Sequence, residues 1–144
     1  MQFCTFHVGE LLLGIEVAQI QEVLRDTKVT PVPKTPAAVS GLINLRGQIV
    51  TAVDLRTLFG LDGEQNTDGG SVMLIVDSDA ELHSLVADSV GDVVEVEEND
   101  YEDPPDTLKG ESRKLIRGAY KLKNGLLLLL DGEYAMQAAT AGSS

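Results

Sequence analysis

Cysteine and histidine are the residue types in this chain best suited to nucleophilic catalysis or zinc binding, and only Cys4, His7 and His83 are present. Cys4 and His7 lie three residues apart in a segment that alternates like a β-strand, so their side chains are expected on opposite faces. With His83 as the one other histidine, a zinc site would be short of ligands. The sequence therefore indicates neither a Cys–His nucleophile nor a metal centre, and we expect no cofactor.

A second candidate for chemistry is the segment MLIVDSD at residues 73–79, an apolar strand that ends in carboxylates. It is similar to the phosphoacceptor strand of a response-regulator receiver. Such a site also needs an acidic pair after the first strand to hold Mg²⁺ with the acceptor. The first expected strand ends instead in Gly9 and Glu10. The helices that a receiver requires between its strands are missing as well, so this class is disfavoured.

The most informative polar residues are Asn44, Arg46 and Gly47, which interrupt the apolar stretch GLINLRGQIVTAVDLR at residues 41–56. Alternation on both sides predicts two short strands hinged at Arg46-Gly47. This corner offers no nucleophile and no base, but a guanidinium suits a planar, multi-donor contact with a partner. Arg46 could equally form a salt bridge with a nearby acid, and the two roles are compatible. Glu22, on the short helix expected before Arg25, is a candidate for that acid.

Composition narrows the possible partners. The chain has 144 residues, enough for one domain with a real core. Its 11 Lys and Arg against 23 Asp and Glu give a net charge of −12, which disfavours binding to nucleic acid or to anionic lipid. Six of the eleven basic residues lie between Lys109 and Lys123, which indicates either a solvated face or electrostatic steering of a partner. One cysteine, no signal peptide and no apolar run long enough to span a bilayer predict a soluble cytoplasmic protein.

The elements that must position these residues are mostly short strands. Apolar residues at positions 17, 20, 23 and 24 have helical spacing and predict a short helix that carries Glu22 and ends near Arg25. A second short helix is expected at 55–59 and a third at 131–139, capped by Asp131. The acidic segment 97–108 is expected to be an exposed loop. Strands are expected at 3–8, 10–15, 43–45, 49–54, 72–76, 82–87, 90–96, 115–122 and 126–130.

The order of these segments favours a mostly β fold of barrels or sandwiches over alternating strands and helices. Residues 62–71 are polar and rich in glycine, and predict a loop near the middle of the chain. About five strands and a short helix are expected on each side of this loop.

Four segments, in this order, resemble the CheW family of coupling proteins: GIEVAQIQEVLR, GLINLRGQIVTAVDLR, VADSVGDVVEV and LIRGAYKLKNGLLLLLD. The likeness extends from Phe3 to Met136. It implies a single CheW-like domain over residues 1–144, with two intertwined five-stranded SH3-like β-barrel subdomains divided near 62–71. It further implies a non-catalytic adaptor in the cytoplasm, recruited to receptor arrays at the inner membrane. Such a protein couples the cytoplasmic tips of chemoreceptors to the regulatory domain of a CheA-type histidine kinase.

The resemblance also implies which residues bind these partners. The receptor is expected in a groove near Val23, Arg46 and Val90, and the kinase on apolar positions of the first barrel. Compared with the family pattern, Thr51 stands where proline is frequent and Ser84 where glycine is frequent. The partner-binding candidates are Ile20, Glu22, Val23, Asn44, Arg46, Gly47 and Val90.

Two other functions remain open from the sequence. A CheW-like domain could compete for a kinase or regulate it in a pathway unrelated to motility. From a different class, a small acidic β-barrel could bind a ligand or act as an enzyme, for which a pocket lined by Asp77, Asp79 or His83 would be required.

Overall fold

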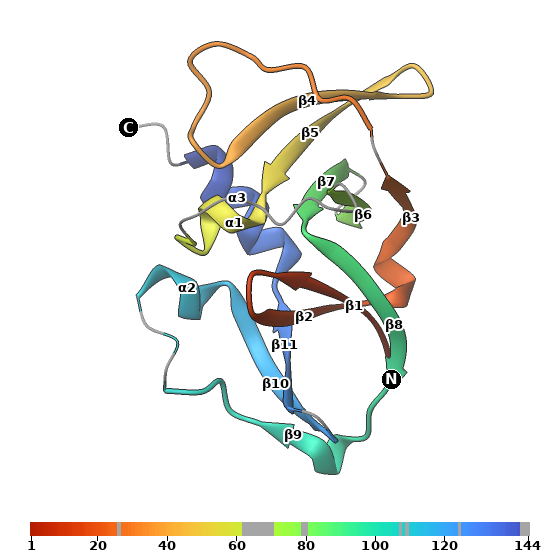
Figure 1. The fold of residues 1–144 in the computed structure, drawn as a ribbon, viewed down its shortest axis with the longest axis vertical. Coiled ribbons are helices and arrows are strands. Elements are labelled where there is room, and N and C mark those ends of the chain that lie inside the picture. The colour runs from red at the N-terminus through yellow and green to blue at the C-terminus, as the bar shows by residue number, and fades with distance from the viewer. Residues whose placement is uncertain are drawn as a thin grey trace.

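The computed structural model describes residues 1–25, 27–61, 71–78, 81–106, 108, 110–123 and 125–141. Over these residues the chain forms two β-sheets (Figure 1), which confirms the predicted mostly β fold. The six-stranded sheet has the order β8-β1-β2-β11-β10-β9 and the five-stranded sheet the order β3-β6-β7-β5-β4. None of the described helices is long and apolar enough to cross a membrane.

The bounds of most strands follow the predicted ones closely; β4 begins at Val39, four residues before the predicted strand, and β3 and β9 are additions. The six-stranded sheet contains β1 (Gln2–Val8), β2 (Leu11–Glu16), β8 (Ser89–Glu95), β9 (Tyr101–Glu102), β10 (Ile116–Leu122) and β11 (Gly125–Leu130). The five-stranded sheet contains β3 (Ile20–Arg25), β4 (Val39–Leu45), β5 (Gln48–Asp54), β6 (Val72–Ser78) and β7 (Glu81–Ala87). The helical segments are η1 (Val17–Gln19), α1 (Leu55–Leu58), η2 (Glu98–Asp100), α2 (Glu111–Lys114) and α3 (Gly132–Ala141).

The two sheets are intertwined along the chain. The N-terminal hairpin β1–β2 belongs to the sheet of the C-terminal strands, because β11 pairs in parallel with β2. In the other sheet, β5 pairs in parallel with β7. The predicted dividing segment, 62–71, therefore leads from α1 to β6 and so connects two parts of the same sheet; all of it but Ser71 lies outside the described residues. The chain changes sheet instead at η1 and between β7 and β8.

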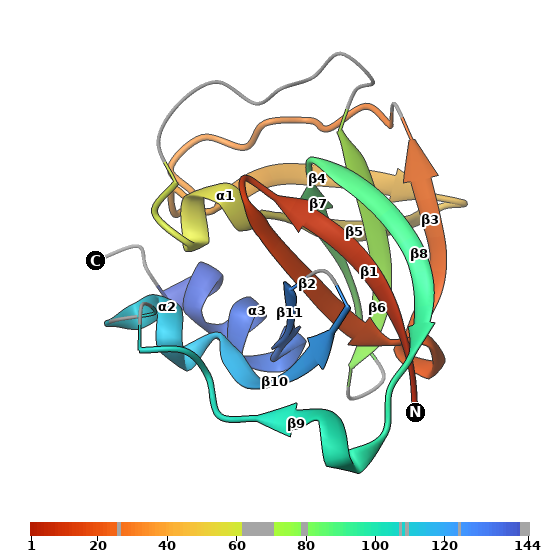
Figure 2. The same ribbon diagram turned by 60° about the horizontal axis from the view of Figure 1, so that its bottom comes forward.

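The six-stranded sheet is strongly curled (Figure 2). Phe3 on β1 and Tyr120 on β10 are separated by two intervening strands, yet their ring centroids lie 5.7 Å apart. In a flat sheet, three strand spacings would place them about 14 Å apart. Phe3, Tyr120, Val96 and Leu127 form a small core on the concave side.

The five-stranded sheet is also drawn together at its edges. Thr30, which follows β3, exchanges two backbone hydrogen bonds with Leu42 on β4, at 2.8 and 2.9 Å. Gly41 allows this close approach, because a Cβ at that position would lie 2.2 Å from the carbonyl oxygen of Thr30. The segment after β3 thus reaches the opposite edge strand of its own sheet.

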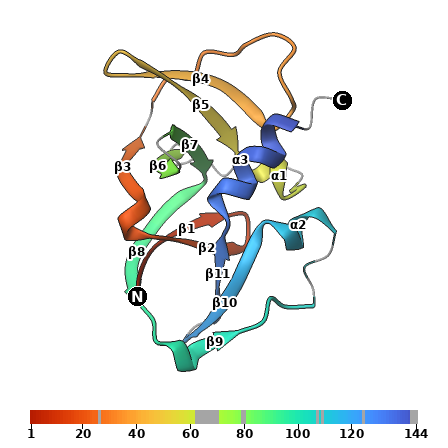
Figure 3. The same cartoon turned by 180° about the vertical axis from the view of Figure 1, so that it is seen from behind.

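The main hydrophobic core draws side chains from both sheets and from α3. Figure 3 shows α3 beside α1, where the two sheets meet. Ala135 and Ala139 of α3 are fully buried, and the carboxylate of Asp131 accepts a hydrogen bond from the backbone N–H of Tyr134 at 2.9 Å. Both the closing helix and its cap are therefore confirmed.

The predicted helix from Val17 to Arg25 is wrong. Only Val17–Gln19 is helical, as a single 3₁₀ turn, and Ile20–Arg25 is strand β3, paired with the buried strand β6. The apolar residues at positions 20, 23 and 24 have the spacing of a helix, but burial along β3 alternates, with Glu22 half-buried and Val23 exposed. Backbone pairing with β6 therefore overrode the helical pattern of the sequence.

The acidic segment 97–108 is also more ordered than a loop. It contains η2 and the two-residue strand β9, in which Tyr101 and Glu102 pair with Tyr120 and Ala119 of β10.

Candidate partner-binding site

The corner predicted at Arg46-Gly47 is a two-residue hairpin turn between β4 and β5, closed by the pair Leu45 and Gln48. Both central residues have positive φ, 51° for Arg46 and 87° for Gly47, as in a type I′ turn. Glycine adopts this conformation readily, whereas an arginine does so at a conformational cost. The side-chain oxygen of Asn44 accepts a hydrogen bond from the N–H of Gly47 at 2.8 Å and so stabilises the turn.

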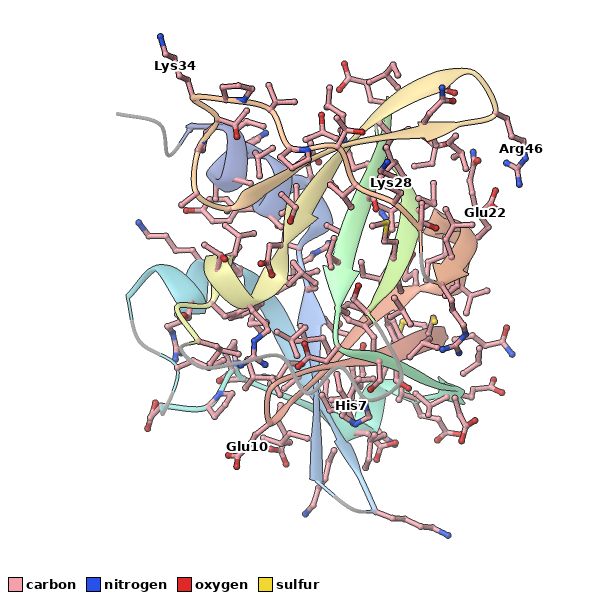
Figure 4. The ribbon with its side chains drawn as sticks, turned by 45° about the horizontal axis from the view of Figure 1, so that its top comes forward. His7, Glu10, Glu22, Lys28, Lys34 and Arg46 are labelled. Atoms are coloured by element: carbon pink, nitrogen blue, oxygen red, sulfur yellow. The ribbon has the colours of Figure 1, made fainter. Side chains whose placement is uncertain are left out.

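Arg46 points from this turn towards Glu22 (Figure 4) and forms a bidentate ion pair with it. Nη1 lies 2.6 Å from Oε2 and Nη2 lies 2.8 Å from Oε1. The hydrogen bonds from Arg46 and the charge of its guanidinium lower the pKa of Glu22 and outweigh burial, which raises it. The Arg46 side chain remains 71% exposed. A carboxylate thus holds the guanidinium in one orientation while most of it still faces solvent.

This ion pair joins opposite edges of the five-stranded sheet. Glu22 lies on β3, one edge strand, and Arg46 follows β4, the other edge strand. The prediction that Glu22 is the partner of Arg46 is confirmed, although Glu22 lies on a strand and not on a helix. Because an exposed ion pair contributes little to stability, we interpret this one as a device that orients Arg46.

Apolar side chains are exposed on both sides of this cluster. Val23 is 36% exposed on β3, and Ile49 is 60% exposed on β5. Ile49 is cross-strand partner to Asn44. Sequence reasoning missed Ile49 as a candidate; its signal is the two-residue turn, which fixes the register and places Ile49 directly across from the polar Asn44.

The seven predicted residues therefore do not all lie together. Glu22, Asn44, Arg46 and Gly47 are connected by hydrogen bonds. Ile20 and Val90 are half-buried against the main core, Ile20 on β3 and Val90 on β8. β3 and β8 are edge strands of different sheets and lie on the same side of the molecule (Figures 1 and 2). A partner that touched all seven would have to contact both sheets.

A second polar cluster lies where the two sheets meet. The guanidinium of Arg56, on α1, donates to Oδ2 of Asp88 at 2.8 Å, and the N–H of Gly9 donates to the same oxygen at 2.7 Å. The two charged side chains are only 12% and 13% exposed. Asp88 joins β7 to β8 and Gly9 joins β1 to β2, so this ion pair connects the two sheets. Its role is structural.

The residues considered for catalysis are not assembled into a site. Cys4 is buried and His7 is exposed, as expected for opposite faces, and burial raises the pKa of the Cys4 thiol. His83 is buried and its pKa is lowered, mainly by desolvation. Asp77 is exposed, and Asp79 lies outside the described residues. In the part of the chain that is described, no group of three or more His, Cys, Asp or Glu side chains could hold a metal ion.

A sequence model of the CheW-like domain matches residues 2–140. The chain belongs to the CheW-like domain family. Among its relatives, a chemotaxis protein CheW from Treponema pallidum is 32% identical over 136 residues, which cover 90% of this chain and 78% of the relative. A chemotaxis protein CheW from Bacillus subtilis is 28% identical over 139 residues, which cover 96% of this chain and 88% of the relative.

The CheW-like fold is shown independently by a solved structure. The scaffolding protein TtCheW from Thermoanaerobacter tengcongensis superposes with a TM-score of 0.83 at 28% sequence identity, covering 93% of this chain and 90% of that protein. The two sheets of this chain therefore form a CheW-like domain, as the four motifs predicted. A family of scaffolds and adaptors is compatible with a chain that has no assembled catalytic group among its described residues.

Proposed function

We propose that this CheW-like domain is a non-catalytic adaptor of chemosensory signalling, which couples chemoreceptors to a CheA-type histidine kinase. Its place of action would be the cytoplasm, at receptor arrays on the inner membrane. Membership of the CheW-like family supports this role, as does the likeness to a protein described as a scaffold. The observation that carries the proposal is the ion pair of Arg46 and Glu22, which presents an exposed guanidinium in a fixed orientation.

The proposed receptor surface comprises Glu22, Val23, Asn44, Arg46 and Gly47, together with Ile20 and Val90 at the edges of β3 and β8. An oriented guanidinium loses less conformational entropy on binding than a freely rotating one. A larger part of the free energy of each hydrogen bond to the partner therefore contributes to affinity. The exposed Val23 supplies apolar area next to it. A contact of this kind is small, and an array would depend on many such contacts made at once.

The proposed kinase surface lies on the five-stranded sheet and includes Ile49. This side chain is 60% exposed, the largest exposed fraction among the large apolar side chains of the described residues. Removing it from water against the regulatory domain of the kinase would be favourable by roughly 1–2 kcal/mol. Ile49 and Arg46 are on the same hairpin, so the two proposed surfaces are close together. Separate substitutions of the two residues are therefore needed to distinguish kinase binding from receptor binding.

The test is a pair of calorimetric titrations, one against the regulatory domain of the CheA-type kinase of the same cell and one against a soluble receptor-tip fragment. We expect one-to-one binding in both. Arg46→Ala should weaken receptor binding about tenfold or more with the fold intact, and Ile49→Ser should weaken kinase binding by a similar factor, since losses of this size are typical of central contacts. Lys121→Ala, an exposed basic residue on the other sheet, is the matched control and should change neither.

Kinase binding without receptor binding would favour the alternative, a domain that competes for or regulates a kinase in another pathway. Binding to neither partner would refute the adaptor role. Unfolding of Arg46→Ala would show that the ion pair has a structural role instead of an orienting one.

A further inference from the structure

A cavity of about 330 Å³ opens at the end of the six-stranded sheet where the N-terminus lies (Figure 2). Its lining comes from β1, β2, β9, β10 and β11, and from Met1 and Gln19. It is therefore the mouth of the curled sheet and lies away from the hairpin of Arg46. Volumes near 300 Å³ are at the small end of the range for ligand sites, and barrel mouths are among the places where such sites occur.

Three aromatic side chains, Phe3, Tyr101 and Tyr120, line this cavity. Phe3 and Tyr120 are 3% and 6% exposed. The ring of Tyr101 packs edge-on against that of Tyr120, with centroids 5.5 Å apart and an interplanar angle of 78°. Tyr101 also lies on the backbone of Gly118, where a Cβ would come within 2.5 Å of its ring. The absence of a side chain at Gly118 therefore lets Tyr101 form one side of the mouth.

The hydroxyl of Tyr120 has unused hydrogen-bonding capacity. Across the described residues, its one contact is with the sulfur of Met1 at 3.8 Å, and a thioether is a weak acceptor. Burial raises the pKa of this phenol, and Glu98, Tyr101 and Glu16 raise it further, so it stays neutral and able to donate. A hydroxyl whose acceptor is a thioether can donate a stronger hydrogen bond to an oxygen acceptor, such as the carboxylate of a ligand.

Two opposite charges line the same cavity without pairing. Glu16 ends β2, and Arg117 occupies the bulge of β10, where the register with β11 shifts. Both side chains are exposed, and neither forms an ion pair with any described residue. Arg46 and Arg56, by contrast, are each held by a carboxylate. Arg117 remains unpaired although acidic residues outnumber basic ones by 23 to 11.

We propose that this barrel mouth binds a small amphipathic zwitterion of the amino-acid class, with its ammonium group at Glu16 and its carboxylate at Arg117. The apolar part of the ligand lies on the ring of Tyr120 and on Phe3. The Tyr120 hydroxyl donates a hydrogen bond to the ligand carboxylate. This site is separate from the proposed receptor and kinase surfaces, so it does not depend on the adaptor role.

The test uses L-leucine and two analogues that each lack one charge, 3-methylbutylamine and 4-methylpentanoate. Each compound is titrated into the ¹⁵N-labelled full chain, and amide shifts are followed by NMR. We expect saturable shifts with L-leucine, centred on Gly14, Glu16 and Gly118. Since an exposed ion pair contributes up to about 1 kcal/mol, each analogue should bind about fivefold more weakly. Equal affinity for the amine or the acid would overturn the zwitterion assignment.

Matched variants locate the site. Arg117→Gln, Glu16→Gln and Tyr120→Phe should each weaken L-leucine binding about fivefold, because each removes one polar contact. Lys121→Gln and Glu102→Gln change the same charges on exposed positions that do not line the cavity, and should have no effect. Shifts that do not saturate, shifts centred elsewhere, or unchanged binding in all three site variants would overturn the proposal.

Discussion

Removing the carboxylate of Asp88 should destabilise the whole domain. Its Oδ2 atom accepts hydrogen bonds from Arg56 at 2.8 Å and from the N–H of Gly9 at 2.7 Å, at the junction of the two sheets. Asp88→Ala would leave the guanidinium of Arg56, 12% exposed, without this carboxylate, and the N–H of Gly9 without its acceptor.

The magnitude follows from that burial. Removing one partner of a buried ion pair typically lowers the free energy of unfolding by about 3–5 kcal/mol. Because a small part of both side chains reaches water and the β1–β2 turn of Gly9 is exposed, we expect a loss of about 3 kcal/mol in the free energy of unfolding. Since domains are typically stable by about 5–15 kcal/mol, that is roughly a fifth to three-fifths of the total stability.

Urea unfolding followed by circular dichroism measures this change, with the m-value as a check that unfolding remains two-state. Asp92→Ala is the matched control, since this exposed aspartate on β8 lies only four residues away and should change stability by less than about 0.5 kcal/mol. The double variant Arg56→Met/Asp88→Leu removes both charges and should be more stable than Asp88→Ala. The reasoning is refuted if Asp88→Ala unfolds at the urea concentration of the unmodified protein.

Two further changes test smaller features of the structure. Ser84→Ala should raise the free energy of unfolding by about 1 kcal/mol, because the Ser84 hydroxyl is fully buried and has no hydrogen-bond partner among the described residues; a loss of stability in urea would show that the hydroxyl is bonded after all. Glu22→Gln should be less stable than the unmodified chain at neutral pH, and the difference should vanish in acid: the folded pKa of Glu22 is lowered, so its contribution is present above its unfolded pKa and is lost as the pH falls through the folded value. A stability difference between the two chains that stayed constant from neutral pH into acid would contradict the ion pair with Arg46.

The local features of the fold could be predicted from the sequence because neighbouring residues determine them. The hinge at Arg46-Gly47 follows from a two-residue gap between alternating segments, and the cap at Asp131 from a carboxylate that precedes a helical segment. The failure at Ile20–Arg25 has a related origin, because the apolar residues of this segment have helical spacing, whereas pairing with β6 places Glu22 on the half-buried face and Val23 on the exposed one.

The features that could not be predicted from the sequence depend on contacts between residues distant in the chain. The carboxylate that holds Arg56 is Asp88, 32 residues away, and no local pattern connects them. The cavity at the barrel mouth likewise depends on Phe3 and Tyr120, which meet only because the sheet curls.

By itself, the sequence determined the mostly β class, the family and the hairpin of Arg46. Those properties depend on alternation, turn chemistry and motifs that can be read within short segments. Glu22 was a candidate from the sequence, but its ion pair with Arg46 spans 24 residues and forms only where the edges of the five-stranded sheet come together. Only the tertiary structure decided that β3 is a strand and which strands share a sheet. The physical reason is that the parallel pairs β2–β11 and β5–β7 join segments distant in the chain, and their stability comes from burial in a common core instead of from local propensity.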